Sequence, residues 1–160
     1  MRIDALTSPS SLGKITPLWN GTRREQVAQH DWVHVLADYG TTPMGEIEVI
    51  SFQTAATRTP GAMLGLVRAL ALFESSLMPA SLIVSQQPSH SLSSPGGIER
   101  MAEAVARGKG CNTDLLLDVD FFQHASEPLE EIRARFAVQP KSSRVLELDP
   151  FGAMKLPSNK

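Results

Sequence analysis

Two helix-forming stretches of this 160-residue chain are separated by only three residues, Gly40 to Thr42, and this spacing constrains the fold more than any other feature. Before the link, Thr22 and Glu25 have the spacing of a capping box, and neither Pro nor Gly interrupts the chain until Gly40, which is suited to end the helix. After it, Thr42 precedes Pro43, a residue favoured in the first turn of a helix because its missing N–H costs nothing there. Because the link is so short, we expect the two helices to be neighbours in space.

The first helix places two histidines on one face. His30 and His34 are four residues apart and therefore point the same way. At about 100° per residue, Asp31 and Asp38 fall on the same stripe. The opposite face is apolar and is predicted to pack on the core, and it carries Trp32, Val35, Leu36 and Tyr39.

In the second helix, the two glutamates, Glu46 and Glu48, are predicted to lie on opposite faces. Glu46 shares its stripe with apolar residues and Gln53, so it is predicted to point inward, whereas Glu48 lies opposite, near Ser51 and Arg58, and is predicted to be solvated. A carboxylate that points inward must be paired or bound to metal, because an unpaired buried charge is very costly.

The short link brings Glu46 toward the histidine face, and this grouping favours a metal site. Neutral imidazole and carboxylate are the usual ligands of zinc, and the same set suits iron or manganese. We therefore predict a divalent metal, with zinc as the first choice, held between the two helices by His30, Asp31, His34 and Glu46. The competing interpretation is that these polar residues only form the solvent-exposed face of an amphipathic helix.

The string HDWVHVLADYGTTPMGEIEVISFQ, which begins at His30, resembles the metal motif of the Coq-four family of ubiquinone (coenzyme Q) biosynthesis, and the specific part of the resemblance is Gln29–Phe52. Weaker similarity extends to SLGKITPLW upstream and to PLEEIRARFAV downstream, so the resemblance spans most of the chain. It implies a metal role for His30, Asp31, His34 and Glu46, position by position.

The resemblance also implies an all-helical fold, a bound divalent metal and affinity for an isoprenoid or polyprenyl-quinone lipid. It implies a part in organising other quinone-biosynthesis proteins and in removing the C1 carboxyl group of a polyprenylated hydroxybenzoate. These implications place the protein in the cytoplasm, peripherally on the inner face of a membrane.

Length and composition narrow the class of protein. A chain of 160 residues suggests one domain, 1–160, large enough for a real core. The net charge is −2 with no basic block, so nothing suggests nucleic acid as a partner. Cys111 is the only cysteine, which excludes an internal disulfide framework and fits a reducing cytoplasm, and we see no signal peptide pattern at the N-terminus.

The segment 61–78 is apolar on nearly all sides. It is short for a bilayer crossing and is interrupted by Arg68 and Glu74, so we predict a central core helix rather than a membrane span. The alternative is the wall of a lipid-tail cavity or a membrane-facing surface. Because so apolar a helix is hard to hide in one small bundle, we also expect a homodimer.

The remaining patterns complete an all-α bundle of about six helices. A Ser- and Pro-rich stretch at 85–97 reads as a flexible linker, and the tail from about 150 reads as loosely ordered. Context favours a helix over a strand at 114–122, and Ser126 is placed to cap a later helix. The helix at 98–107 is predicted to turn four residues inward, namely Ile98, Met101, Ala102 and Val105.

Three functions are compatible with these features. The first is a metal-dependent component acting on a lipid-tailed aromatic acid. The second is a non-catalytic scaffold that binds isoprenoid lipid and has a structural metal. The third is a metallohydrolase with Asp31 as general base and Glu46 as third ligand, although Asp is one methylene shorter than the Glu of the usual His-Glu-x-x-His motif. An open coordination position on the metal would favour catalysis over the scaffold.

Overall fold

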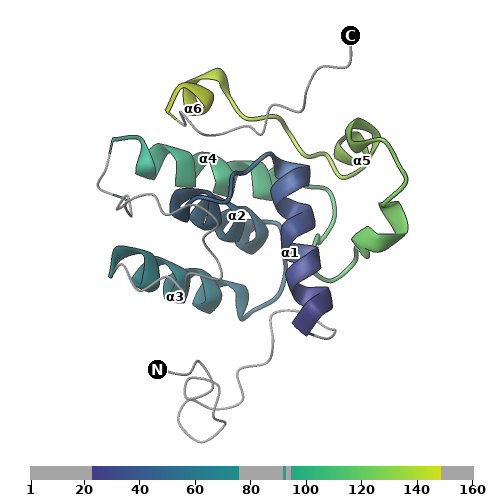
Figure 1. Cartoon of the computed structure of the whole chain (residues 1–160), viewed down its shortest axis with the longest axis horizontal. Coiled ribbons are helices and arrows are strands. Elements are labelled where there is room, and N and C mark those ends of the chain that lie inside the picture. The colour runs from purple at the N-terminus through teal and green to yellow at the C-terminus, as the bar shows by residue number, and fades with distance from the viewer. Residues whose placement is uncertain (1–22, 76–91, 93–94, 149–160) are drawn as a thin grey trace, which may run out of the picture.

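The computed structural model describes residues 23–75, 92 and 95–148, and this part of the chain contains helices and no strands. The all-α prediction is therefore confirmed. Six α-helices and one short 3-10 helix follow one another in the order α1 (Arg23–Ala37), α2 (Pro43–Ala55), α3 (Ala62–Glu74), α4 (Gly97–Gly110), η3 (Phe121–His124), α5 (Leu129–Arg135) and α6 (Ser143–Leu148) (Figure 1).

The central element is α2. It lies between α4 and α3, while α1 crosses beside it (Figure 1). Ten of its thirteen residues are buried, including both glutamates. A helix surrounded in this way has no solvent face, so its polar residues must find partners inside the protein.

The start of α2 follows from the link that precedes it. The helix begins at Pro43, which lies in the first turn as predicted, and Thr42 is its N-cap, with its hydroxyl accepting a hydrogen bond from the Gly45 N–H at 3.1 Å. A Cβ atom at Gly45 would lie 2.0 Å from the carbonyl oxygen of Gly40, so only glycine lets the link fold back so tightly. The first helix ends at Ala37, earlier than predicted, because Asp38 adopts a left-handed conformation with φ of 59°.

The prediction that the third segment is the central core helix is wrong. One face of α3 is buried against the core through Ala62, Leu66, Ala69 and Phe73. The opposite face is exposed, with Met63 at 60% and Val67 at 54% of their accessible surface. Since apolar residues occupy both faces of this helix, the hydrophobic periodicity of the sequence could not identify which face is buried. No helix within the described ranges has the length and apolar character needed to cross a bilayer.

Helices α2 and α4 approach closely. A Cβ at Gly108 would lie 2.2 Å from the Phe52 carbonyl oxygen, so glycine permits this approach. The predicted inward face of α4 is only partly right. Met101 is partly buried and packs against the core, and Val105 is partly buried, but Ala102 is exposed and Ile98 is 64% exposed. The fully buried positions are Gly97, Arg100, Ala104, Arg107 and Gly108.

The prediction that Glu48 is solvated is also wrong, and the same interface explains why. Glu48 is fully buried and accepts two hydrogen bonds from Arg100, at 2.6 Å from Nη2 and 3.2 Å from Nε. The ammonium of Lys141 lies 3.9 Å from the same carboxylate. Arg100 can therefore occupy the buried face of α4, because the carboxylate of Glu48 on α2 balances its charge.

The apolar face of α1 is confirmed in part. Leu36 and Tyr39 are buried, and Trp32 is partly buried and stacks on Phe121, but Val35 is 53% exposed. The main core gathers side chains from α1, α2, α4 and the C-terminal segments, and its largest fully buried members include Leu36, Phe52, Leu115, Phe121 and Ile132.

The C-terminal part is less regular than predicted. The 114–122 stretch forms a turn followed by the start of η3 rather than an α-helix, and α5 begins at Leu129 with Pro128, not Ser126, at its N-cap. Arg133 forms an ion pair with Glu130 at 2.7 Å and also donates to the Leu36 carbonyl at 2.8 Å, which satisfies the end of α1. The Thr22 cap, most of the 85–97 linker and the tail from 150 lie outside the described residues.

Candidate metal centre

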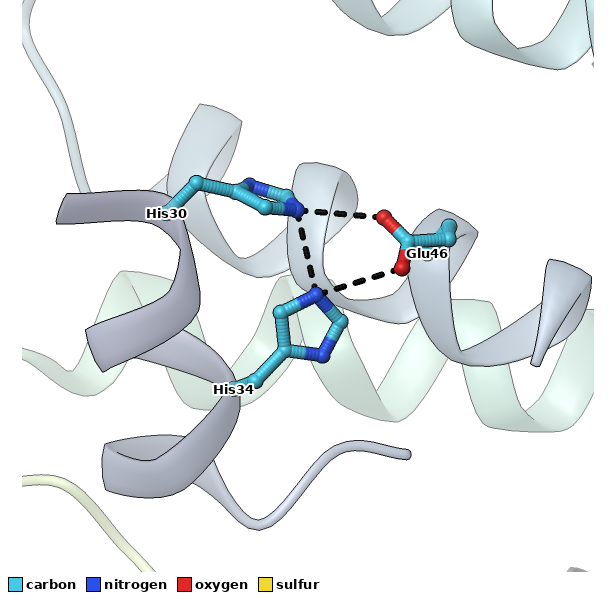
Figure 2. A group of neighbouring side chains, drawn as sticks. All are labelled: His30, His34 and Glu46. Atoms are coloured by element: carbon cyan, nitrogen blue, oxygen red, sulfur yellow. Dashed lines mark hydrogen bonds and ion pairs between the residues drawn. The ribbon is translucent and has the colours of Figure 1, made fainter. Parts of the chain in front are cut away.

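Three side chains from α1 and α2 converge on one point (Figure 2). The Nε2 atom of His30 lies 3.1 Å from Glu46 Oε2, and the Nε2 atom of His34 lies 3.3 Å from Glu46 Oε1. The two Nε2 atoms are themselves 3.1 Å apart. The predicted convergence of His30, His34 and Glu46 is therefore present in the structure.

Local structure accounts for this arrangement. The histidines are one turn apart on α1, and Glu46 lies in the first turn of α2, just after the folded link. The link therefore brings the start of α2 opposite the middle of α1.

The other nitrogen of each imidazole is already engaged. Nδ1 of His34 donates to the Tyr39 carbonyl oxygen at 3.2 Å, and Nδ1 of His30 donates to Gln53 Oε1 at 3.3 Å. A carbonyl oxygen only accepts, so these bonds put the proton on Nδ1 and leave the lone pair of each neutral ring on Nε2. Metal-binding histidines are commonly oriented by such bonds.

The spacing of the donor atoms fits a metal ion. Two ligands each 2.0–2.1 Å from a tetrahedral zinc are roughly 3.3 Å apart. The three measured distances, 3.1, 3.1 and 3.3 Å, are close to that value. Two lone pairs facing each other at 3.1 Å would repel, so this geometry calls for a proton or a metal cation between them.

The site is largely shielded from solvent. The side chains of His30, His34 and Glu46 are 15%, 7% and 5% exposed. Burial lowers the pKa of His34, but the hydrogen bond and charge of Glu46 outweigh it and raise that pKa above its ordinary value. Burial likewise raises the pKa of Glu46, whereas hydrogen bonds from His30 and His34, which the rings can donate only when Nε2 carries a proton in place of a metal ion, lower it below its usual range.

Asp31 occupies a different position from the other predicted ligands. It is exposed, and it does not belong to the group whose ligand atoms lie within 4.8 Å of one another. Its charge still contributes to the raised pKa of His34. A direct ligand role for Asp31 stays a prediction.

Two supporting groups were not predicted from the sequence. The Tyr39 carbonyl is a backbone group, so no residue type in the sequence marks it, and it could not be predicted from the sequence. Gln53 could have been found, because it shares the stripe of Glu46 two turns later; its Nε2 atom is buried without a hydrogen-bond partner, next to His30.

Comparisons with family models, with curated proteins and with solved structures gave no match to this chain.

Proposed function

We propose that the protein is a metalloprotein in which His30, His34 and Glu46 hold one divalent cation, with zinc as the first choice and iron or manganese as alternatives. The observation that carries the proposal is the convergence of two imidazole Nε2 atoms and a carboxylate, with both Nδ1 atoms held by other groups. The donor set and its spacing fit the group without rearrangement of the helices.

Three protein donors favour a catalytic role over a structural one. Structural zinc sites are closed by four protein ligands, whereas catalytic sites keep a position open for water or substrate. The exposed position of Asp31 supports an open site, and it also disfavours the metallohydrolase alternative, which needs that carboxylate as general base.

We further propose that this centre serves ubiquinone synthesis, at the removal of the C1 carboxyl group of a polyprenylated hydroxybenzoate. The support is the resemblance of residues 29–52 to the Coq-four motif, together with the three converging donors. A bound metal would supply a Lewis acid for a carboxylate or phenolate. The buried protein donors would fix its position and exclude water from most of its surroundings.

The exposed apolar face of α3 supports the lipid part of this proposal. Met63, Leu64 and Val67 are each more than half exposed, which suits contact with an isoprenoid tail, with the surface of a membrane or with a second copy in a homodimer. In this proposal the protein acts in the cytoplasm, peripherally on the inner face of a membrane and alongside other quinone-biosynthesis proteins.

The test is complementation of cells that lack this decarboxylation step. The parent should restore quinone levels, and His34→Ala and Glu46→Ala should not. If these variants restored quinone as well as the parent while accumulating equally, the non-catalytic scaffold would replace the catalytic proposal. If the parent failed but bound prenyl lipid, the quinone assignment would be dropped.

A further inference from the structure

The end of α1 is closed by a left-handed residue that is not glycine. Asp38 has φ of 59°, and the N–H of Tyr39 donates to the His34 carbonyl oxygen at 3.0 Å. A bond of this span across a left-handed residue is characteristic of the Schellman motif, which satisfies a free carbonyl at the end of a helix. The carbonyl that the motif uses here belongs to His34, one of the three converging donors of the metal centre.

Tyr39 also bonds to the His34 side chain. Its carbonyl oxygen accepts a hydrogen bond from His34 Nδ1 at 3.2 Å, so the N–H and the C=O of one residue hold both the backbone and the ring of His34. The left-handed conformation of Asp38 turns Tyr39 back toward the histidine. If Asp38 were helical, α1 would continue, and the Tyr39 carbonyl would point along the helix axis instead of toward the ring.

The side chain of Tyr39 keeps this carbonyl in place because it is anchored in the core. It is 6% exposed, and its ring packs edge-on against Phe52 with the ring centres 5.9 Å apart. Two cations lie over the same ring, with the Arg107 guanidinium at 4.9 Å and the Lys141 ammonium at 4.8 Å from its centre. The end of α1 is therefore tied to α2, to α4 and to the segment that precedes α6.

The contribution of Asp38 is its backbone conformation rather than a side-chain contact. Among the described residues, its carboxylate takes part in no hydrogen bond or ion pair. Asp and Asn adopt the left-handed region more readily than most residues, glycine adopts it freely, and a β-branched residue there is a genuine outlier. The residue type at position 38 therefore acts on the metal centre through the turn that it permits.

We propose that Asp38 is a positioning residue of the metal centre: its left-handed turn places the Tyr39 carbonyl against His34 Nδ1 and so directs the Nε2 lone pair toward the metal. The inference rests on the proposed metal role of His34. An imidazole can carry its proton on either nitrogen, and a ring that is already fixed in the binding tautomer and orientation needs no reordering when the metal binds. The turn should therefore raise metal affinity in addition to ending the helix.

The role of Asp38 is tested by zinc titration of the full chain against a chelating dye. Asp38→Val disfavours the left-handed turn and should weaken zinc binding by about 10–100-fold, the usual cost of losing a group that orients a metal-binding histidine. Asp38→Gly and Asp38→Asn keep the turn accessible and should bind zinc as the parent does. Equal zinc affinity of Asp38→Val and Asp38→Asn would overturn the proposal, whereas a parent that bound no zinc would refute the metal centre itself.

The end of α5 supplies a matched control. Ala137 is also left-handed, with φ of 56°, and the Val138 N–H donates to the Arg133 carbonyl oxygen at 2.9 Å across it. Ala137→Val introduces the same side chain in the same backbone conformation, at a helix end that holds none of the three converging donors. It should lower the free energy of unfolding as Asp38→Val does and leave the zinc Kd unchanged. An equal loss of zinc affinity would assign the effect to general destabilisation and overturn the proposal.

The Nδ1 proton of His34 gives a second readout, which a purely structural role of Asp38 would not change. In the zinc-loaded parent this proton is held by the Tyr39 carbonyl in a side chain that is 7% exposed, so its NMR signal should be protected from exchange with water. In Asp38→Val, saturated with zinc, the signal should exchange rapidly, and in Asp38→Asn it should be protected as in the parent. Equal protection in Asp38→Val and the parent would show that the turn does not hold the ring.

Discussion

The Nε2 atoms of His30 and His34 face each other at 3.1 Å, and Glu46 closes the triangle from the next helix (Figure 2). Because both Nδ1 atoms donate elsewhere, the two neutral rings would oppose lone pair to lone pair. A cation between the two Nε2 atoms would be bound by both lone pairs, which removes their mutual repulsion. The histidine pair therefore links the local structure of α1 to the proposed function.

The amide of Gln53 should tune metal affinity without being a ligand. Gln53→Leu removes the acceptor for His30 Nδ1 and frees the ring to rotate. Loss of such a supporting bond typically weakens metal affinity by about 10–100-fold. Competition with a chelating dye should measure this change in zinc Kd, with Gln123→Leu, at an exposed position on η3, as the control. An unchanged Kd for Gln53→Leu would show that the amide does not orient His30.

Asp31 and Glu46 should contribute very differently to the metal site. Glu46→Gln alters a carboxylate that touches both imidazoles, whereas Asp31→Asn alters an exposed one outside the converging group. We expect Glu46→Gln to weaken zinc binding by at least about ten-fold more than Asp31→Asn does. Equal losses in the two variants, measured in the same dye assay, would instead make Asp31 a direct ligand.

The buried carboxylate of Glu48 should be important for stability. Glu48→Gln leaves Arg100 and Lys141 buried with less counter-charge, and breaking such a pair costs roughly 3–5 kcal/mol. Urea unfolding should show this loss in the free energy of unfolding. The control Glu99→Gln, exposed in the first turn of α4, should change it by less than about 0.5 kcal/mol. A small effect of Glu48→Gln would mean that the ion pair is not required to dock α4 on α2.

Asp114 should make stability depend on pH. Burial raises its pKa, but hydrogen bonds from the Arg58 N–H, the Thr57 hydroxyl and two further backbone N–H groups outweigh this and lower the pKa. A carboxyl whose folded pKa is lowered stabilises the fold above its unfolded pKa of about 3.9, and this contribution is lost as the pH falls through the folded value.

Asp114→Asn should therefore cost about 1–2 kcal/mol of unfolding free energy at pH 7 and progressively less below about pH 4. Chemical unfolding of parent and variant between pH 7 and pH 3 measures the difference. A deficit that stayed constant over that range would assign the effect to shape rather than to charge.

The parts of the fold that could be predicted are those fixed by short-range spacing. The i, i+4 histidines, the helix start at Pro43 and the short link depend on local geometry, and together they bring His30, His34 and Glu46 into one site. The burial of Glu48 depends on Arg100, which is 52 positions away in sequence, and the polar buried face of α4 depends in turn on Glu48. Contacts so distant in sequence leave no local pattern. The buried face of α3 could not be predicted because both of its sides are apolar.

The most direct test of the account is the metal content of the purified protein. Chain stripped by chelator, reloaded with zinc and freed of excess metal should hold about one ion per chain by elemental mass spectrometry. His30→Ala/His34→Ala should hold almost none, while the control His124→Ala/Glu127→Ala, at half-buried positions away from the site, removes a second histidine–carboxylate pair and should keep the ion. One ion per chain in the His30→Ala/His34→Ala protein would contradict the proposed metal centre.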